Sequence, residues 1–275
     1  MYETRLISAD LNGTLVHQHT MSDMIRIYKG EDAFKEAKAI FEKQTSGTAT
    51  MEKAFQVSGP LTRGLTLRQA IEYTKTHMKY LRGFNKLIDF LYDNKFPLII
   101  NSTGYSVTFY AIREQVGNNK ISGFIGNILR FGNHGEPNAT ISEEELEKKA
   151  KSYFFDSEAV DDRSYDEIQA TGVIDLGIPD EEAKASLLQA YAKKHFPELK
   201  SNQLIHIGDT MGDSGGILGV AKAGGIGIAF NYNEALEVYL KKKLEEEKIT
   251  GKVFFIDKKE DSADLTHVIP VLEAV

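Results

Sequence analysis

Short apolar runs alternate along the chain with longer segments that show helical periodicity. Five runs have the length and composition of buried strands: residues 5–9, 97–101, 203–207, 225–229 and 253–256. Apolar strands separated by helices are typical of α/β proteins, because helices cover both faces of a parallel sheet. The pattern therefore predicts an α/β fold with a mostly parallel sheet.

The stretch between the first two predicted strands is too long for a single crossover helix. It contains three segments with apolar residues at helical spacing: residues 33–43, 50–57 and 67–79. A further helix over residues 82–94, with Gly83 at its start, then leads into the second strand. Residues 16–81 are therefore predicted to form a helical unit inserted after the first strand.

The second half of the chain continues the alternation. Helices are predicted over residues 105–116 and 183–195, and extended chain over 121–131 with a turn at 132–135. Ser142 and Glu145 have the spacing of a capping box, which predicts the start of a polar helix. Residues 156–170 fit neither pattern and are interpreted as a surface loop or a small subdomain.

Composition excludes several classes of protein. The 275 residues include no cysteine, which excludes disulfides, thiolate metal sites and cysteine nucleophiles. The net charge of -7 argues against nucleic-acid binding, which depends on Lys and Arg. No apolar run approaches the roughly 18 residues that a membrane-spanning helix requires, and the first residues lack the apolar region of a secretory signal. We therefore expect a cytoplasmic protein that binds neither membranes nor nucleic acids.

Charge is distributed unevenly along the chain. Residues 140–182 include fourteen acidic and four basic side chains, whereas residues 50–82 include six basic and two acidic ones. The basic segment fits two interpretations, a solvated helical face or a surface that faces an anion.

Polar side chains follow three of the predicted strands. Asp10 follows the first strand, Ser102 and Thr103 follow the second, and Asp209 follows the strand at 203–207. Each has an ordinary alternative explanation: Asn-Gly after Asp10 favours a hairpin, Ser or Thr caps a helix, and Asp occupies turns. Together they are more specific, because open α/β sheets bind ligands at the carboxyl ends of their strands.

Lys184, at the start of the predicted 183–195 helix, adds a fourth element, and the set resembles the motifs of the haloacid dehalogenase superfamily of phosphatases. The phosphoserine phosphatase-like branch is the most similar. The segments that carry the likeness are Asp-Leu-Asn-Gly-Thr-Leu at 10–15, Arg-Gly-Leu-Thr at 63–66, Leu-Arg-Gly-Phe at 81–84, Ile-Asn-Ser-Thr-Gly-Tyr at 100–105, Phe-Ile-Gly-Asn at 124–127, Gly-Asp with Asp213 at 208–213, and Ala-Gly-Gly-Ile-Gly-Ile-Ala-Phe at 223–230. The likeness covers about residues 6–236, and the acidic segment 140–175 has no counterpart in it.

The resemblance implies a Rossmann-like core formed by residues 1–15 and 82–275, with residues 16–81 as an inserted α-helical cap. It further implies a Mg²⁺-dependent phosphatase that acts on a small-molecule phosphate ester. Asp10 would be the nucleophile that forms an aspartyl-phosphate. Mg²⁺, which prefers oxygen ligands, would be bound by Asp10, Asp209 and the backbone carbonyl of Asn12, and Asp213 would hold its water molecules.

The phosphoryl group would be held by the remaining motif residues. The resemblance assigns its oxygens to Ser102 and Lys184, with Lys184 also reducing repulsion between the two anions. Backbone N–H groups near Leu11 and Thr103 would add donors, and Thr103 and Gly104 would lie beside the substrate.

Asn12 departs from the family pattern, which has a second aspartate two residues after the nucleophile, acting as general acid and then as base. An amide cannot exchange a proton with a leaving group, and such catalysis is typically worth about 10²–10⁴-fold. Three explanations follow: an Asp→Asn variant that traps substrate, a leaving group that needs no protonation, or a slow enzyme or sensor. The alternative functions are therefore a phosphate-ligand-binding regulator and a phosphotransferase.

The predicted cap should determine the substrate, because it closes over the site. Candidates to meet a second anionic group of the substrate, such as a carboxylate, are Arg63, Arg68, His77 and Lys79. His17 and His19, just beyond the first motif, either face the pocket or are simply exposed.

Overall fold

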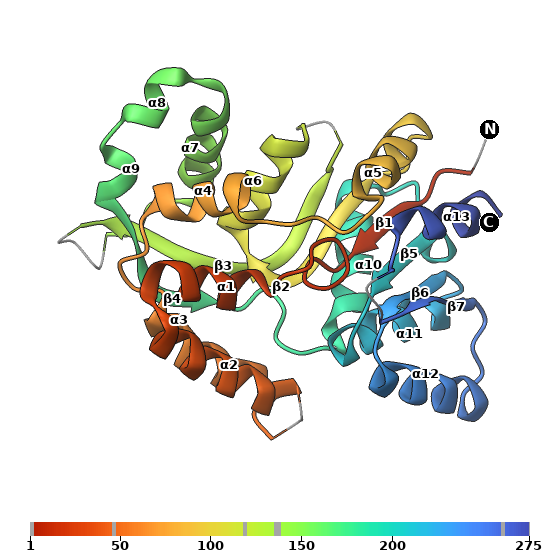
Figure 1. Ribbon diagram of the computed structural model, residues 1–275. Helices are drawn as coiled ribbons and strands as arrows, with labels where there is room; N and C mark the ends of the chain where they lie inside the picture. Colours follow the sequence, from red (N-terminus) through yellow and green to blue (C-terminus); the bar gives the residue numbers. More distant parts are fainter. Residues whose placement is uncertain (1–2, 46–47, 118–119, 135–138, 260–261, 275) are drawn as a thin grey trace.

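A sheet of seven strands organises the part of the chain that the computed structural model describes, namely residues 3–45, 48–117, 120–134, 139–259 and 262–274 (Figure 1). The strands are β1 (Leu6–Ala9), β2 (Leu98–Tyr105), β3 (Gly123–Asn133), β4 (Ile168–Asp175), β5 (Leu204–Gly208), β6 (Ile226–Tyr232) and β7 (Lys252–Lys258). Their order is β4-β3-β2-β1-β5-β6-β7, and only the β3–β4 pair is antiparallel. The predicted α/β fold with a mostly parallel sheet is confirmed.

The central strands β1 and β5 are buried along their whole length, as their mostly apolar sequences predict. All five predicted strands are present, with ends displaced by a few residues. The largest displacement is in β2, which continues through Ser102 and Gly104 to Tyr105, with an irregularity in its pairing to β3 after Asn101. Polar side chains expected in a loop therefore lie on the strand itself.

Four helices separate β1 from the crossover helix α5 (Phe84–Asp93), three of them at the segments that the periodicity predicts and a further one before those segments. These inserted helices are α1 (Thr20–Lys29), α2 (Glu31–Thr45), α3 (Met51–Leu61) and α4 (Leu67–Thr76). Gly83 precedes α5 with φ +79°, and a Cβ there would lie 2.2 Å from an oxygen of Asp264. Only glycine therefore fits at the position before α5.

The remaining helices follow the sheet strands. They are α6 (Ser106–Val116), α7 (Glu143–Phe155), α8 (Ser157–Asp161), α9 (Ser164–Glu167), α10 (Ala183–His195), α11 (Ser214–Lys222), α12 (Glu234–Glu246) and α13 (Ile269–Glu273). No helix among the described residues is both long and apolar enough to cross a lipid bilayer.

The region for which the sequence predicted no helix or strand has regular secondary structure. Residues 156–170 form α8, α9 and the start of β4, which adds an antiparallel edge to the sheet. The turn predicted at 132–135 begins later than expected, because Gly132 and Asn133 still pair with β4 and His134 is the first turn residue. Gly135 lies outside the described residues.

Apolar side chains form two large clusters. One lies around β1, β2, β5 and β6, beneath α5 and α6. The other joins the inserted helices to α6, α7, α9, β3 and β4, with Tyr73, Tyr105, Phe131, Tyr153 and Ile168 among its buried members. Figure 1 shows this arrangement: α1–α4 and α7–α9 surround one end of the sheet, and α10–α13 lie at the other.

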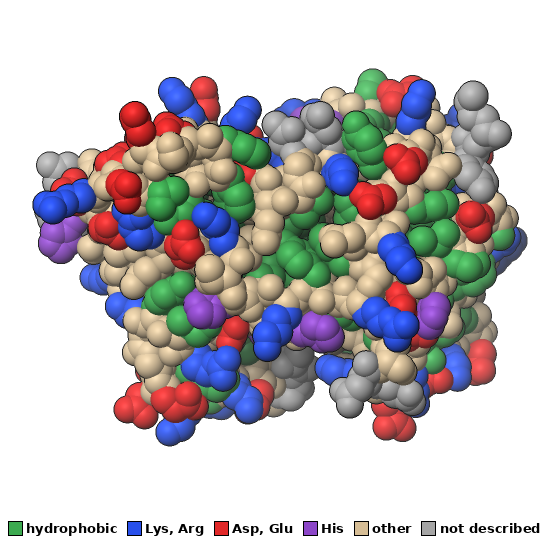
Figure 2. All heavy atoms as spheres, turned by 45° about the horizontal axis from the view of Figure 1, so that its top comes forward, with side chains coloured by type: hydrophobic (Ala, Val, Ile, Leu, Met, Phe, Trp, Pro, Cys, Tyr) green, Lys and Arg blue, Asp and Glu red, His purple; other side chains and the backbone are tan. Residues whose placement is uncertain are grey.

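The basic segment 50–82 and the acidic segment 140–182 contact each other in the structure. Arg68 on the basic segment pairs through Nε with both carboxylate oxygens of Asp166, at 2.9 and 3.0 Å, and donates through Nη2 to the carbonyl of Asp162 at 2.8 Å. The Lys75 ammonium lies over the ring of Tyr153, 5.1 Å from its centroid. Across the face in Figure 2, basic and acidic side chains are interspersed rather than segregated. The basic helix α4 is therefore, in part, the partner of the acidic segment.

We expect Arg68→Ala to lower the free energy of unfolding by about 0.5–1.5 kcal/mol, because it removes the hydrogen bonds that join α4 to the Asp162 carbonyl and the Asp166 carboxylate. Urea denaturation measures the change, and limited proteolysis should cleave first between α7 and β4. Arg163→Ala, which removes an exposed arginine nearby, is the matched control. Equal stability of the two variants would contradict the anchoring role of Arg68.

Candidate functional site

Three adjacent parallel strands bring the predicted chemistry together at one edge of the sheet. Asp10 follows β1, Ser102 lies in β2, and Asp209 follows β5, with β1 paired to both of the others. Asp10, Asp209 and Asp213 each offer a carboxylate oxygen, and these oxygens lie within 4.8 Å of one another. All three residues are buried.

Lys184 is buried in the middle of this cluster. Its Nζ is 2.9 Å from Oδ1 of Asp10 and 2.6 Å from Oδ1 of Asp213. The first turn of α10 carries Lys184, and Asn101 in β2 donates through Nδ2 to its backbone carbonyl at 3.2 Å. Although burial opposes it, the two carboxylates raise the pKa of Lys184, so the ammonium is charged.

The Asp213 carboxylate accepts hydrogen bonds from Lys184 and from two backbone N–H groups. The residue ends the short helix Met211–Asp213, where its Oδ2 accepts the backbone N–H groups of Asp209 and Thr210 at 3.1 and 3.3 Å. Burial would raise its pKa, but Lys184 and His206 outweigh that effect and lower it. Asp213 is therefore ionised and fixed in place.

Asp10 and Asp209 differ from Asp213 in their electrostatics. Burial raises the pKa of Asp10, with Lys184 opposing and Asp213 adding to the rise, while the Ser102 side chain lowers it as a hydrogen-bond partner. Burial raises the pKa of Asp209 well above its usual value, and the charges of Asp213 and Asp10 add to the effect. Three buried carboxylates thus share one lysine, which leaves an excess of negative charge.

The loop after Asp10 closes on Asp209 and is not a hairpin. Gly13 has φ +80°, and a Cβ there would lie 2.1 Å from Oδ2 of Asp209, so the loop approaches that carboxylate as closely as glycine allows. Thr14 donates through Oγ1 to Oδ1 of Asp209 at 3.2 Å, and Asn231 donates to the carbonyl of Gly13 at 2.7 Å. The Asn12-Gly13 pair, which in the sequence favoured a hairpin, instead allows the loop to approach Asp209 closely.

Asn12 connects the same loop to the inserted helices. Its Oδ1 accepts the backbone N–H of Thr20, the first residue of α1, at 2.8 Å. The side chain thereby caps α1, which has no side-chain cap from His19, the residue directly before it.

The segment after Ser102 is braced by a neighbouring asparagine. Asn127 donates through Nδ2 to the carbonyl of Thr103 at 2.9 Å, and its Oδ1 accepts the N–H of Gly177 at 3.0 Å. Gly104 donates its N–H to Oγ of Ser102 at 3.4 Å. Asn127 belongs to the 124–127 segment noted in the sequence, so the structure joins that segment to the Ser102 motif.

Arg63 and Arg68 are not brought to this cluster. Arg63 donates through Nε to the carbonyl of Thr171 at 3.1 Å, and Arg68 is bound by the α8–α9 segment. The side-chain contacts described for the two arginines are with Tyr153 of α7, the α8–α9 segment and β4, so the expectation that they meet a second anionic group of the substrate finds no support in these contacts.

The histidines and Lys79 lie on the surface of the inserted unit. His17, His19, His77 and Lys79 are exposed. His77 stacks on Tyr73, with ring centroids 6.2 Å apart, and the backbone of Lys79 pairs with His17 and Gln18. None of the described contacts of these four residues includes Asp10 or Lys184.

Two buried residues of the site were missed in the sequence. Ser8 and His206 lie on the adjacent strands β1 and β5, with Ser8 Oγ 3.0 Å from Nδ1 of His206, and Nε2 of His206 is 3.5 Å from Asp213. A polar residue within each of two otherwise apolar strands was the available signal.

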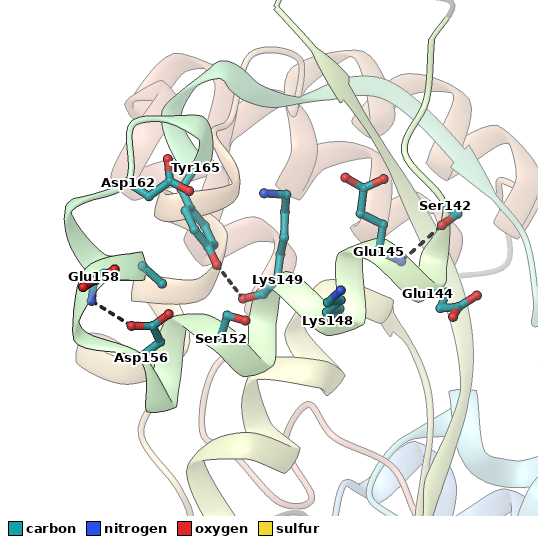
Figure 3. Close-up of a pocket in the computed structure, with 11 residues that line it drawn as sticks. Ser142, Glu144, Glu145, Lys148, Lys149, Ser152, Asp156, Glu158, Asp162 and Tyr165 are labelled. Atoms are coloured by element: carbon teal, nitrogen blue, oxygen red, sulfur yellow. Dashed lines mark hydrogen bonds between the residues drawn. The ribbon is translucent and has the colours of Figure 1, made fainter.

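A cavity of about 720 Å³ lies away from this cluster, between α7 and the α8–α9 segment (Figure 3). Its lining carries both charges, with Lys148 and Lys149 among acidic side chains that include Glu145 and Asp162. The hydroxyl of Tyr165 donates to the backbone carbonyl of Lys149 at 2.9 Å across this space. The cavity shares no lining residue with the Asp10 cluster.

Comparison with known proteins places the fold. No protein-family model and no curated protein matches the sequence. Among solved structures, a phospho-aspartyl intermediate analogue of phosphoserine phosphatase is 17% identical with a TM-score of 0.65, covering 98% of this chain and 99% of that one. A substrate-bound phosphoserine phosphatase complex is 18% identical, with the same TM-score and coverage.

A further neighbour comes from the same superfamily. A haloacid dehalogenase family hydrolase from Salmonella enterica serovar Typhi is 14% identical with a TM-score of 0.65, covering 98% of this chain and 71% of that one. The chain therefore has the fold of the phosphoserine phosphatase-like branch of that superfamily, a Rossmann-like sheet with a cap, and the likeness seen in the sequence is confirmed at the level of fold.

Proposed function

We propose that this chain is a Mg²⁺-dependent phosphohydrolase that acts on a small phosphorylated metabolite through an aspartyl-phosphate on Asp10. The observation that carries the proposal is the buried cluster at the carboxyl ends of β1, β2 and β5, in which Lys184 bridges Asp10 and Asp213. The same fold in phosphoserine phosphatases supports it.

The residues present fit a divalent cation. Three carboxylates with oxygens within 4.8 Å of one another share only one buried lysine, and burial raises the pKa of two of them. All are hard oxygen donors of the kind that Mg²⁺ prefers. Asp10, Asp209 and the backbone carbonyl of Asn12 would hold the ion, and Asp213 would orient its water. The bound ion would supply charge to offset the phosphoryl oxygens.

Each side chain has a task that follows from its position. An oxygen of the Asp10 carboxylate attacks phosphorus, while Lys184 and the Ser102 hydroxyl bind the phosphoryl oxygens. Thr103 and Gly104 present the adjacent backbone, which Asn127 holds in place. Because Asp10 is only 7% exposed and Ser102 is fully buried, the site excludes bulk water around the reacting atoms.

Phosphate release from a panel of phosphorylated metabolites, with and without Mg²⁺, tests the proposal. The chain is run beside Asn12→Asp, which would restore a group able to transfer protons. We expect Mg²⁺-dependent release and, after acid quenching, protein that carries one phosphoryl group by mass spectrometry. A panel that leaves both proteins unphosphorylated and releases no phosphate would refute the hydrolase.

A phosphotransferase is the second candidate, and Asn12 favours it. Without a base beside the aspartyl-phosphate, water is poorly activated, and an acceptor that brings its own nucleophile would compete. Product would then appear only when that acceptor is supplied, whereas a regulator that only binds ligand would show thermal stabilisation without turnover.

Magnesium should stabilise the protein more at alkaline than at acidic pH. Because burial raises the pKa of Asp209, the folded metal-free site holds a proton at low pH that the cation must displace, and this competition ends as the pH rises through that pKa. We expect a larger increase in Tm on adding Mg²⁺ at about pH 8 than at about pH 5.5. Asp209→Asn should abolish the increase at both, and a shift independent of pH would contradict the assignment.

A further inference from the structure

We propose that the site takes a phosphoric anhydride, an acyl phosphate or a diphosphate linkage, rather than a phosphate ester of an alcohol. The inference rests on the proposed function and names its substrate class. It comes from the groups around Asp10, which hold the phosphoryl group well but offer the departing oxygen no transferable proton.

The two kinds of substrate differ in their need for a proton. An alkyl phosphate releases an alkoxide, which is about as basic as hydroxide, the conjugate base of water with its pKa of about 15.7. An acyl phosphate releases a carboxylate, whose conjugate acid has a pKa of about 4. The first departure requires a proton donor in the site, and the second proceeds without one.

Asn12 lies where the loop leaves Asp10 and turns to Asp209, and its orientation is fixed. The backbone N–H of Thr20 donates to its Oδ1 at 2.8 Å, which identifies Oδ1 as the end facing α1 and Nδ2 as the other end. Nδ2 can donate a hydrogen bond to a departing oxygen, but an amide does not release its proton at neutral pH.

Three ionisable side chains that cluster with the Asp10 carboxylate, namely Lys184, Asp209 and Asp213, are already committed to other contacts. Lys184 has its ammonium in two ion pairs, at 2.9 and 2.6 Å, which engage two of its three protons. Asp213 accepts from Lys184 and from two backbone N–H groups, and Asp209 accepts from Thr14. These carboxylates act as acceptors in the contacts that the structure gives them.

His19 is adjacent to the Asn12 contact but is turned toward the inserted helices. It precedes Thr20, its Nδ1 is 3.1 Å from Oγ of Ser22, and its ring centroid is 5.0 Å from that of Phe41 in α2. This packing places the imidazole on the α1–α2 side of the loop.

The chemistry balances without a general acid. An oxygen of Asp10 bonds to phosphorus as the bond from phosphorus to the bridging anhydride oxygen breaks, and the electron pair leaves on a carboxylate or phosphate. Water then bonds to phosphorus, the bond from phosphorus to Asp10 breaks, and the carboxylate is restored. Both hydrogens of the water enter the released phosphate, which ionises in solvent.

Steady-state kcat/KM with Mg²⁺ tests the inference on matched substrates. The anhydrides are acetyl phosphate and pyrophosphate, and the alkyl esters are glycerol phosphate and O-phosphoserine. Phenyl phosphate and 4-nitrophenyl phosphate form a pair of similar shape with leaving groups of different basicity. Each is measured on the unaltered chain, on Asn12→Asp, and on Asp10→Asn as the blank for uncatalysed hydrolysis.

We expect the unaltered chain to prefer anhydrides and to favour 4-nitrophenyl over phenyl phosphate. Asn12→Asp should accelerate the alkyl esters and phenyl phosphate by about 10²–10⁴-fold and the anhydrides by only a few-fold. An aspartate also accepts the Thr20 N–H, so α1 keeps its cap and an unchanged Tm confirms the fold. Equal use of esters and anhydrides by the unaltered chain would overturn the inference and leave the hydrolase intact.

Failure of the proposed function looks different, because neither the unaltered chain nor Asn12→Asp would then form a phosphoenzyme with any substrate. His19→Asn tests whether His19 donates a proton to the leaving group. We expect it to leave the ratio between phenyl and 4-nitrophenyl phosphate unchanged, and a selective loss of phenyl phosphate turnover would identify His19 as the acid and overturn the inference.

Discussion

Asp10→Asn should reduce phosphate release on the order of 10⁴-fold or more, as expected for loss of the nucleophile of a covalent mechanism. The amide keeps the shape of the side chain and can still accept from Lys184, but its oxygen no longer attacks phosphorus. Release of phosphate and acid-stable labelling of the protein should disappear together.

The stability of this variant separates chemistry from folding. Burial raises the pKa of Asp10, so the folded state disfavours its charge, and above its usual pKa the ionised carboxylate costs stability. The neutral amide should therefore unfold at the same urea concentration as the unaltered chain or a higher one. Asp32→Asn, which changes a fully exposed carboxylate in the same way, is the control for effects that do not depend on burial. Retained labelling in Asp10→Asn would place the nucleophile elsewhere.

Lys184→Met should lower the free energy of unfolding by about 3–5 kcal/mol, because it leaves the Asp10 and Asp213 carboxylates buried without their shared cation. Lys184 is 3% exposed and lies within 2.9 Å of both partners, so solvent cannot replace it. Urea denaturation without Mg²⁺ measures the loss, and activity should be lost as well.

Two comparisons make this result specific. Lys35→Met removes an exposed lysine of α2 and should change stability by less than about 0.5 kcal/mol. Adding Asp213→Asn to Lys184→Met removes one of the two unpaired charges and should recover part of the lost stability. A single variant as stable as Lys35→Met would show that the buried pairs contribute nothing net.

The sheet and the candidate cluster around Asp10 were predictable because their signals are local. Runs such as residues 203–207 identify strands, and Asp10, Ser102 and Asp209 each follow or end one of them. Parallel strands in neighbouring positions bring such ends together without further information. Lys184 could be added to this set because it lies in the helix predicted directly before β5.

The features that were missed depend on long-range pairing. Arg68 meets Asp166 across 98 positions, so neither segment alone indicates that the charges neutralise each other. The strand β4 has Ala170 and Gly172 at buried positions where larger side chains would have marked it, and its pairing with β3 defines it instead. Ser8 and His206 lie in strands whose apolar neighbours dominate the pattern.

The shared apolar cluster bears on how proteins of this fold can diverge. Tyr73 and Phe55 of the inserted helices pack in one cluster with Tyr153 and Tyr165 of the acidic segment. Excising residues 16–81, or exchanging them for the insert of another protein of this fold, would remove packing partners of α6, α7 and β4 as well. An exchange that preserves this packing would therefore have to transfer the insert and the acidic segment together.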